Sequence, residues 1–183
     1  MIINYKYIYK TIPVIQYYIF NLQHNFLMQK DQLNKSLLTL KNHFRYQFKV
    51  LTCISGVDFP KNYYRFSIVY ELLNIKYNSR LRIKVVVNEI TPVNSAEKIF
   101  LAANWFECEI WDMFGVFFNN KSNITKLLTD YGFQGFPLRK DFPLSGFAES
   151  RFSSVKNRVV YENLELSQEY RIFDFISPWE NLN

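Results

Sequence analysis

The stretch Asn94–Gly115, with the sequence NSAEKIFLAANWFECEIWDMFG, decides the fold because it carries the clearest helical pattern in the chain. Its apolar residues recur at the spacing of one helix face, at Ile99, Ala103, Phe106, Ile110 and Phe114. Asn94 can cap the start, Glu97 completes a capping box three residues later, and Gly115 suits the C-terminal cap. The pattern predicts a helix from Asn94 to Gly115 with one buried face.

A second helical pattern begins at Asp31, whose carboxylate can accept hydrogen bonds from the amides of a first turn. Apolar residues follow on one stripe at intervals of four, three and four residues, at Leu33, Leu37, Leu40 and Phe44. We expect this stripe to pack in the core. The same spacing would also suit a partner-binding face.

Three segments between these helices are typical of strands. They are rich in β-branched and apolar residues and cover residues 48–54, 64–73 and 81–87. In the third segment, apolar residues alternate with Arg82 and Lys84, which indicates one buried face. Tyr77-Asn78-Ser79 is a turn signal and predicts an antiparallel hairpin. Together these elements predict an α+β fold, with an antiparallel or mixed sheet and two main helices.

The pattern weakens at both ends of the chain. From Glu149 onward, aromatic and charged residues mix without a strong repeat. We therefore expect an N-terminal extension over residues 1–30, an α+β domain over residues 31–118, and a long extended partner-binding tail over residues 119–183. The aromatic residues of the tail would suit anchors on a partner surface, or they fold back on the domain: Tyr161, Tyr170, Phe173, Phe175 and Trp179.

Composition points to a folded chain with a mildly basic surface. The chain has 183 residues, of which 49% are hydrophobic and 21% charged, and its net charge is +6. These values predict a packed core in one compact domain with some extra segment. Basic residues alternate with acids rather than forming a run. A solvated surface is therefore favoured over nucleic-acid binding, and a basic RNA-binding or organellar ribosomal protein is the rival interpretation.

The residues that build metal and nucleotide sites are scarce. The chain has two cysteines, Cys53 and Cys108, and two histidines, His24 and His43, whereas an iron–sulfur cluster takes about four thiolate or histidine ligands. No glycine-rich phosphate loop is present. The apolar stretch Ile12–Leu22 is too short and too polar to span a bilayer. We expect no metal, cofactor or catalytic residue in this chain.

Acidic residues concentrate on the predicted helix over Asn94–Gly115. Glu109 and Asp112 lie about one turn apart on one face, with Glu107 nearby. Such acids would suit a free-standing enzyme, but an ion-pair cluster that faces solvent or a partner is favoured.

Several ordered stretches resemble one family, the 30-kilodalton subunit family of respiratory complex I, and most closely its mitochondrially encoded members. The similar stretches are residues 56–60, 77–80, 104–118, 128–133, 137–146 and 173–179. The resemblance implies that the signature and interface residues are Glu107, Glu109, Asp112, Lys121, Arg139, Lys140, Asp141 and Trp179. Cys108 stands where the signature has arginine, and Thr125 where it has a basic residue or proline.

The resemblance implies a structural role in the peripheral arm of complex I, on the matrix side of the mitochondrial inner membrane, during electron transfer from NADH to ubiquinone coupled to proton translocation. It implies that the tail packs on a hydrogenase-like subunit that helps form the quinone pocket, beside other peripheral-arm subunits. Flavin, iron–sulfur clusters and quinone would be bound by neighbouring subunits, and the membrane would be reached only through the complex. Arg139, Lys140 and Asp141 are expected to anchor their loop through charge-assisted hydrogen bonds. Related subunits of membrane-bound hydrogenases or the plastid dehydrogenase are nearer alternatives.

Overall fold

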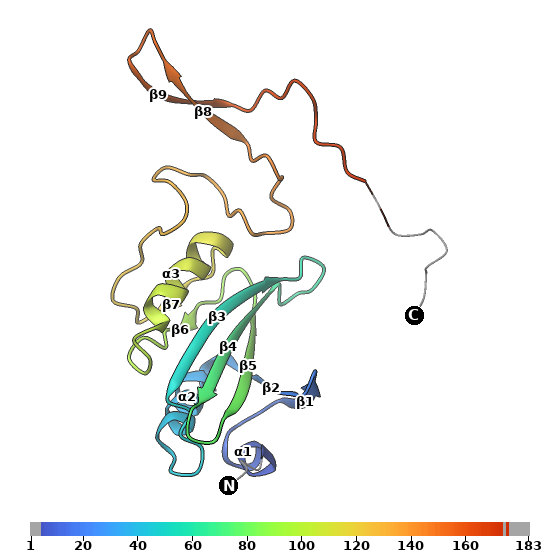
Figure 1. Cartoon of the computed structure of the whole chain (residues 1–183), viewed down its shortest axis with the longest axis vertical. Coiled ribbons are helices and arrows are strands. Elements are labelled where there is room, and N and C mark those ends of the chain that lie inside the picture. The colour runs from blue at the N-terminus through green and yellow to red at the C-terminus, as the bar shows by residue number, and fades with distance from the viewer. Residues whose placement is uncertain (1–4, 174, 176–183) are drawn as a thin grey trace. The chain divides into compact units, whose positions relative to one another are not determined.

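The computed structural model describes residues 5–173 and residue 175 (Figure 1). The chain divides into two compact units, Met1–Phe142 and Pro143–Asn183. Within the described residues, no helix is long and apolar enough to cross a membrane.

Unit 1 is built on a mixed sheet of five strands in the order β1-β2-β5-β4-β3 (Figure 1). The strands are β1 (Gln16–Phe20), β2 (Gln23–Met28), β3 (Val50–Asp58), β4 (Phe66–Asn74) and β5 (Ser79–Val87). Only the pairing of β2 with β5 is parallel in this sheet; the other neighbours are antiparallel. A short parallel pair, β6 (Val93–Asn94) with β7 (Phe118–Asn119), flanks the third helix of the unit.

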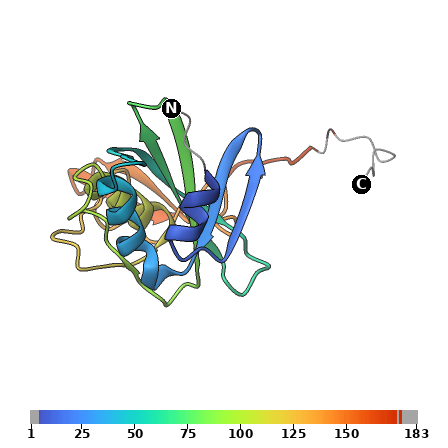
Figure 2. The same ribbon diagram turned by 90° about the horizontal axis from the view of Figure 1, so that it is seen from below.

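The helices of unit 1 cover one face of this sheet. They are α1 (Tyr5–Thr11), α2 (Leu33–Asn42), preceded by the 3-10 turn η1 (Lys30–Gln32), and α3 (Ala103–Phe114). Figure 2 shows α1 and α2 on the same side of the strands. Their apolar residues join the inward side chains of the sheet in one core cluster. Because the side chains of a strand alternate between faces, this arrangement buries every second residue of β5, from Leu81 to Val87.

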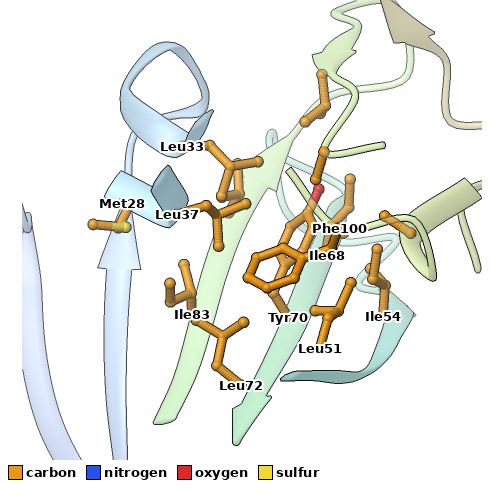
Figure 3. Packing of buried hydrophobic residues seen from close by; sticks show 14 of the residues in the cluster. Met28, Leu33, Leu37, Leu51, Ile54, Ile68, Tyr70, Leu72, Ile83 and Phe100 are labelled. Atoms are coloured by element: carbon orange, nitrogen blue, oxygen red, sulfur yellow. The ribbon is translucent and has the colours of Figure 1, made fainter. Parts of the chain in front are cut away.

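The centre of the core lies between α2 and the strands. Figure 3 shows Leu33 and Leu37 of α2 directed toward Tyr70 and Ile83 of the sheet. All four side chains are fully buried. Each such aliphatic or aromatic side chain contributes roughly 1.5–3 kcal/mol when it leaves water, so this contact fixes α2 on the sheet.

Unit 2 contains an antiparallel hairpin of β8 (Ala148–Ser153) and β9 (Arg158–Asn163). Asn157 in its turn has a φ of 48°, a left-handed conformation that asparagine tolerates better than most residues. The sequence led us to expect little regular structure after Glu149, and this expectation was wrong for the hairpin.

The predicted α+β fold is confirmed, and so are its three central strands. β3, β4 and β5 overlap the predicted segments, and β4 and β5 form the expected antiparallel hairpin. Its turn places Asn78 at a φ of 45°. Gly115 ends α3 in the left-handed conformation, with a φ of 78°, as its position predicted.

The start of α3 differs from the prediction. The helix begins at Ala103, and Asn94 lies in β6 instead of at an N-terminal cap. Glu97 does not complete a capping box, because its carboxylate accepts hydrogen bonds from the amide and hydroxyl of Ser122. Glu97 therefore makes a tertiary contact instead of capping the start of a helix.

The predicted stripe of α2 is correct for Leu33, Leu37 and Leu40, which are buried. It is wrong for Phe44, which is 67% exposed, because the helix ends at Asn42 and the backbone turns extended at His43. Asp31 lies in the 3-10 turn, and no side chain caps α2.

Two expected boundaries differ from the units of the structure. Within residues 1–30, expected to form an extension, β1 and β2 join the sheet, and Ile8 and Ile12 lie in the core. Unit 1 ends at Phe142 rather than at residue 118. The reason is that residues 119–142, although irregular, hydrogen-bond to α3 and β3.

We expect Gly115→Ala to lower the free energy of unfolding by roughly 2–3 kcal/mol. The substitution strains a left-handed residue and places Cβ 2.6 Å from the Phe136 ring. Gly132 has a similar φ of 87°, but nothing lies within 4 Å of the position that a Cβ would take there, so Gly132→Ala should cost only about 1 kcal/mol. Chemical denaturation of the purified variants checks this difference, and equal losses would contradict the close packing at Gly115.

Candidate functional site: an anchored loop after helix α3

The segment Leu127–Asp141, called here the anchored loop, contains no helix or strand. An irregular segment keeps one conformation only where its backbone groups find partners. In this loop the partners come from α3, β3 and the residue that precedes β4, and they lie at both ends of the loop.

Asp112 of α3 holds the first end. One of its carboxylate oxygens accepts hydrogen bonds from the amides of Leu128 and Thr129, both at 2.9 Å, and from Leu127 at 3.2 Å. The other oxygen accepts from the Thr129 hydroxyl. Burial raises the pKa of Asp112, but these hydrogen bonds outweigh it and lower the pKa overall. A buried carboxylate thus organises three successive amides.

The C-terminus of α3 holds the second end. The Arg139 guanidinium donates to the carbonyl of Phe114 at 2.8 Å, and the Leu138 amide donates to the carbonyl of Met113. Both acceptors are carbonyls of the last turn of α3, where cations are favoured. Arg139 also lies over the rings of Phe66 and Phe136, in positions suited to cation–π attraction.

Asp58, the last residue of β3, is the third anchor. It is 2% exposed and accepts the backbone amide of Lys140 at 2.9 Å. It also receives a bidentate pair of hydrogen bonds from Arg65, at 2.7 and 2.9 Å. Arg65 lowers the pKa of Asp58, because a nearby cation favours the charged carboxylate.

Arg65 links this anchor to Asp141 and Glu89. Its guanidinium lies 2.9 Å from the Asp141 carboxylate and 2.6 Å from that of Glu89. Three acids therefore share one guanidinium, and the pKa of Arg65 is raised, chiefly by its hydrogen bond to Asp58.

Between its anchors the loop presents apolar side chains to solvent. Gly132 and Gly135 both have positive φ values, 87° and 98°, which allow the chain to reverse there. The exposed residues are Leu128 at 65%, Tyr131 at 80%, Phe133 at 38% and Leu138 at 54%. A fixed backbone that displays aromatic and aliphatic side chains is typical of an interface.

Glu107 and Lys121 form a second, separate buried pair. Their charged atoms lie 3.6 Å apart, and their side chains are 0% and 1% exposed. Glu107 accepts the Ser95 hydroxyl at 2.6 Å and the Ala96 amide at 2.7 Å, while Lys121 donates to Asn104. Burial raises the pKa of Glu107 despite these hydrogen bonds. The pair ties the segment before α3 to the segment after it.

Cys108 and Thr125, the two residues that depart from the family signature, contact each other in the structure. The Thr125 hydroxyl lies 4.0 Å from the Cys108 sulfur, to which it donates a weak hydrogen bond. Cys108 is buried and also faces the carbonyl of Asn123 at 3.7 Å. Two neutral side chains thus meet where the signature carries arginine at one position and a basic residue or proline at the other.

The remaining signature residues divide between surface and interior. Glu109 is exposed on α3 while Asp112 is buried, so the two acids do not form the shared cluster predicted from their spacing. The Lys140 side chain lies over the Phe59 ring, and its backbone makes the contact with Asp58. Trp179 lies outside the described residues.

Sequence reasoning missed Asp58 and Arg65 as anchors. Asp58 lay within the Gly56–Pro60 stretch that carries the resemblance, and an acid at the end of an apolar strand is a signal for a buried partner. Arg65 precedes β4 and gave no such signal, since only the fold brings it to Asp58 and Asp141.

The described residues contain no group of three or more His, Cys, Asp or Glu side chains arranged to hold a metal ion. Cys53 and Cys108 are both free thiols, one on β3 and one on α3. Arg65 and Arg139 are engaged by acids and carbonyls within unit 1, which leaves them poorly placed to bind phosphates.

The sequence profile described as "Respiratory-chain NADH dehydrogenase, 30 Kd subunit" matches residues 26–148, the part of the chain that holds most of the sheet, α3 and the anchored loop. The chain belongs to this family. No comparison supports the RNA-binding alternative.

Individual relatives agree with the family. The chain is 54% identical over 143 residues to "NADH-ubiquinone oxidoreductase subunit 9" of Reclinomonas americana, covering 78% of this chain and 70% of that protein. It is 49% identical over 158 residues to the protein of the same name from Prototheca wickerhamii, covering 86% and 82%. It is 49% identical over 153 residues to "NADH dehydrogenase [ubiquinone] iron-sulfur protein 3" of Beta vulgaris, covering 84% and 80%.

A solved structure shares the fold. A chain in the structure of the membrane-bound sulfane sulfur reductase, an archaeal respiratory membrane complex, superposes with a TM-score of 0.64. The match covers 76% of this chain and 83% of that chain at 24% identity.

We expect Asp112→Asn to lower the free energy of unfolding by about 2 kcal/mol, because an amide group cannot accept all the hydrogen bonds that the carboxylate receives. Glu109→Gln, an exposed change on the same helix, should stay within about 0.5 kcal/mol of the wild type. Urea denaturation of both variants checks the contrast. If Asp112→Asn were as mild as Glu109→Gln, Asp112 would not be an anchor.

The Asp58–Arg65 ion pair predicts that the free energy of unfolding falls in acid. The pKa of Asp58 is lower in the folded chain, so its contribution is fully present above the ordinary carboxyl range, about pH 4, and is lost as the pH falls through the lowered value. The difference in unfolding free energy between wild type and Asp58→Asn should therefore shrink from about pH 6 to about pH 3. A difference that stays constant over this range would exclude the ion pair as its source.

Proposed function

We propose that this chain is a scaffold subunit in the peripheral arm of complex I and supports the quinone module during electron transfer from NADH to ubiquinone. Membership of the 30-kilodalton family supports the assignment to this oxidoreductase. The observation that carries the scaffold role is the anchored loop, a surface held rigid from inside the subunit.

The proposed partner of the anchored loop is the hydrogenase-like subunit that helps form the quinone pocket. A loop that is already ordered loses little conformational entropy when it binds. Its exposed Tyr131 and Phe133 are of the residue type that often contributes most to interface energy. Asp112 and Asp58 thus act indirectly, because they set the position of the side chains that bind.

The hairpin of unit 2 supports a second point of attachment. Its pairing register places Phe152, Val159 and Tyr161 on one face and the Arg151–Glu162 ion pair on the other. The three apolar side chains are 65%, 58% and 62% exposed. An isolated two-stranded hairpin is marginally stable in water, and burial of its apolar face against a partner would stabilise it.

Flavin, iron–sulfur clusters and quinone are assigned to neighbouring subunits. The full chain has two cysteines and two histidines, and a common cluster needs about four such ligands gathered at one place. Cys53 and Cys108 lie on different elements and make no disulfide. The proposed role of this chain is therefore to hold neighbouring subunits in position.

The same proposal places the chain on the matrix side of the mitochondrial inner membrane, attached through the complex. Its support is the similarity to proteins named as subunits of NADH-ubiquinone oxidoreductase.

An enzyme that uses the acids of α3 is less compatible with the geometry. Glu107 and Asp112 are both buried and already accept hydrogen bonds from the chain itself, while Glu109 faces solvent. They do not converge on one point where a substrate would bind.

Removal of residues after Phe142 should prevent assembly of the quinone module, because the hairpin face would be lost while unit 1 remains folded. Phe152→Asp with Tyr161→Asp should weaken assembly at least tenfold, whereas Val155→Asp, at the 91% exposed turn position, should not. Native electrophoresis with in-gel NADH dehydrogenase staining, followed by identification of this chain in the active band, measures the outcome. Full assembly with the truncated chain would contradict the proposal.

A further inference from the structure

Strand β1 leaves one edge of the five-stranded sheet open. It lies at the end of the strand order, and no described strand pairs with its free side (Figure 1). Proteins usually protect such an edge with charged residues, proline, a bulge or a covering segment. The sequence of β1 is QYYIF, without charge or proline, and its register with β2 continues from Gln16 to Phe20. The strand therefore presents an unprotected template for pairing.

The strand at the other end of the sheet, β3, carries two forms of protection. Its register with β4 shifts between Leu51 and Cys53, and irregularities of this kind twist an edge away from further pairing. Helix α3 also packs against β3, where a Cβ on Gly56 would lie 2.8 Å from the Phe114 ring. Of the two edges of this sheet, the one formed by β1 is thus the better site for another strand.

The hairpin turn determines which backbone groups of β1 face the open edge. Residues 21–22 (Asn-Leu) have positive φ values, 48° and 60°, as in a two-residue type I′ turn. Such a turn bonds Phe20 across the hairpin. Hydrogen-bonded pairs then alternate along the strands, so Tyr18 also bonds to β2. The N–H and C=O groups of Tyr17 and Ile19 therefore point to the open edge.

The side chains beside this edge define what an added strand would meet. Ile19 and Phe20 are 58% and 60% exposed. The Lys84 ammonium lies 5.4 Å from the centre of the Tyr18 ring and forms no ion pair with any described residue. Successive side chains of a strand point to opposite faces, so Ile19 and Tyr18 lie on opposite sides of β1. The edge thus combines an apolar side with a cationic side.

We propose that β1 binds an extended segment of another subunit as a sixth strand, in which apolar residues alternate with Asp or Glu. The backbone groups of Tyr17 and Ile19 would pair with the segment, as in other complexes formed by β-strand addition. An added strand lies roughly 4.8 Å from β1, so its acidic residues come within reach of Lys84. Its apolar residues cover Ile19 on the other side.

Charge argues against a second copy of this chain as the occupant. Residues 1–30 contain three lysines and no Asp or Glu, so a second β1 would offer Lys84 no acid. Pairing of two copies about a two-fold axis would also bring their Lys84 side chains toward each other, and like charges repel.

This inference rests on the proposed function, because it assigns the sixth strand to the same complex. It adds a site of a different kind to the anchored loop, since backbone pairing at β1 depends on strand geometry. Hydrogen exchange of single amides, read by mass spectrometry with electron-transfer fragmentation, compares the purified chain with the intact complex. We expect the amides of Tyr17 and Ile19 to slow at least tenfold in the complex. The amide of Tyr18, already bonded to β2, should exchange slowly in both states.

Two pairs of variants test the backbone and the charge separately, in chains whose purified form keeps the wild-type exchange of β4. Ile19→Pro removes an outward N–H without removing a bond to β2, whereas Ile19→Ala keeps that N–H. In the complex, Ile19→Pro should return Tyr17 to the exchange rate of the purified chain, and Ile19→Ala should keep it protected. Lys84→Glu should speed exchange of Tyr17 at least threefold. Lys76→Glu, at the exposed turn between β4 and β5, should leave it within a factor of 1.5, on the order of measurement error.

Equal exchange of Tyr17 and Ile19 in the purified chain and the complex would overturn the inference while leaving the scaffold role intact. Equal effects of Lys84→Glu and Lys76→Glu would overturn it too. Protection already present in the purified chain, and lost on removal of residues after Phe142, would identify the chain's own tail as the occupant, against the inference. Protection that rises with chain concentration would identify a second copy, with the same consequence. A wild-type chain that does not enter the complex would instead count against the scaffold role.

Discussion

The structure depends on buried carboxylates that hold an irregular segment in place. Residues 127–141 have no helical or strand ladder to satisfy their backbone, so Asp112 and Asp58 supply acceptors instead. Both carboxylates lie within regular elements, one in α3 and one at the end of β3, which makes their positions as rigid as the core. Hydrogen bonds to an ionised acceptor are stronger than neutral ones. The loop therefore inherits the rigidity of the sheet and helix.

A second buried group, the Glu107–Lys121 ion pair, connects the segments that precede and follow α3. Glu107 binds the backbone before the helix and Lys121 lies after it. A buried pair of this kind adds little net stability over an apolar alternative, and its loss from one side only is costly. The pair instead favours one arrangement of the chain, because it determines which segments lie beside α3. The Cys108–Thr125 contact places two neutral side chains together at these signature positions.

Much of the fold follows from the sequence because local pattern and tertiary structure agree there. The alternation in β5 predicted burial correctly, and so did the stripe of α2 as far as Leu40, while Gly115 predicted the end of α3. The prediction failed where tertiary contacts override local signals. Glu97 hydrogen-bonds to Ser122 instead of completing a capping box. The strands β1 and β2 were not predicted, because they are recognisable only in the sheet, where β2 pairs with β5 and β1 pairs with β2. The anchors Asp58 and Arg65 were missed because Asp58 meets Lys140, and Arg65 meets Asp141, only in the folded chain. Local sequence patterns thus predict the sheet and its helices, whereas contacts between residues distant in sequence determine the conformation of the anchored loop.

We conclude that the anchored loop is ordered before it meets a partner. Hydrogen exchange of the Leu128 and Thr129 amides in the purified chain tests this conclusion most directly, because both amides donate to Asp112. We predict exchange slowed at least a hundredfold relative to an unstructured peptide. The amide of Tyr131, whose only hydrogen bond among the described residues is a solvent-exposed one to the adjacent Asp130 carboxylate, should exchange faster. Exchange of residues 128 and 129 at the unstructured rate would show that the loop becomes ordered only on binding, and would contradict this conclusion.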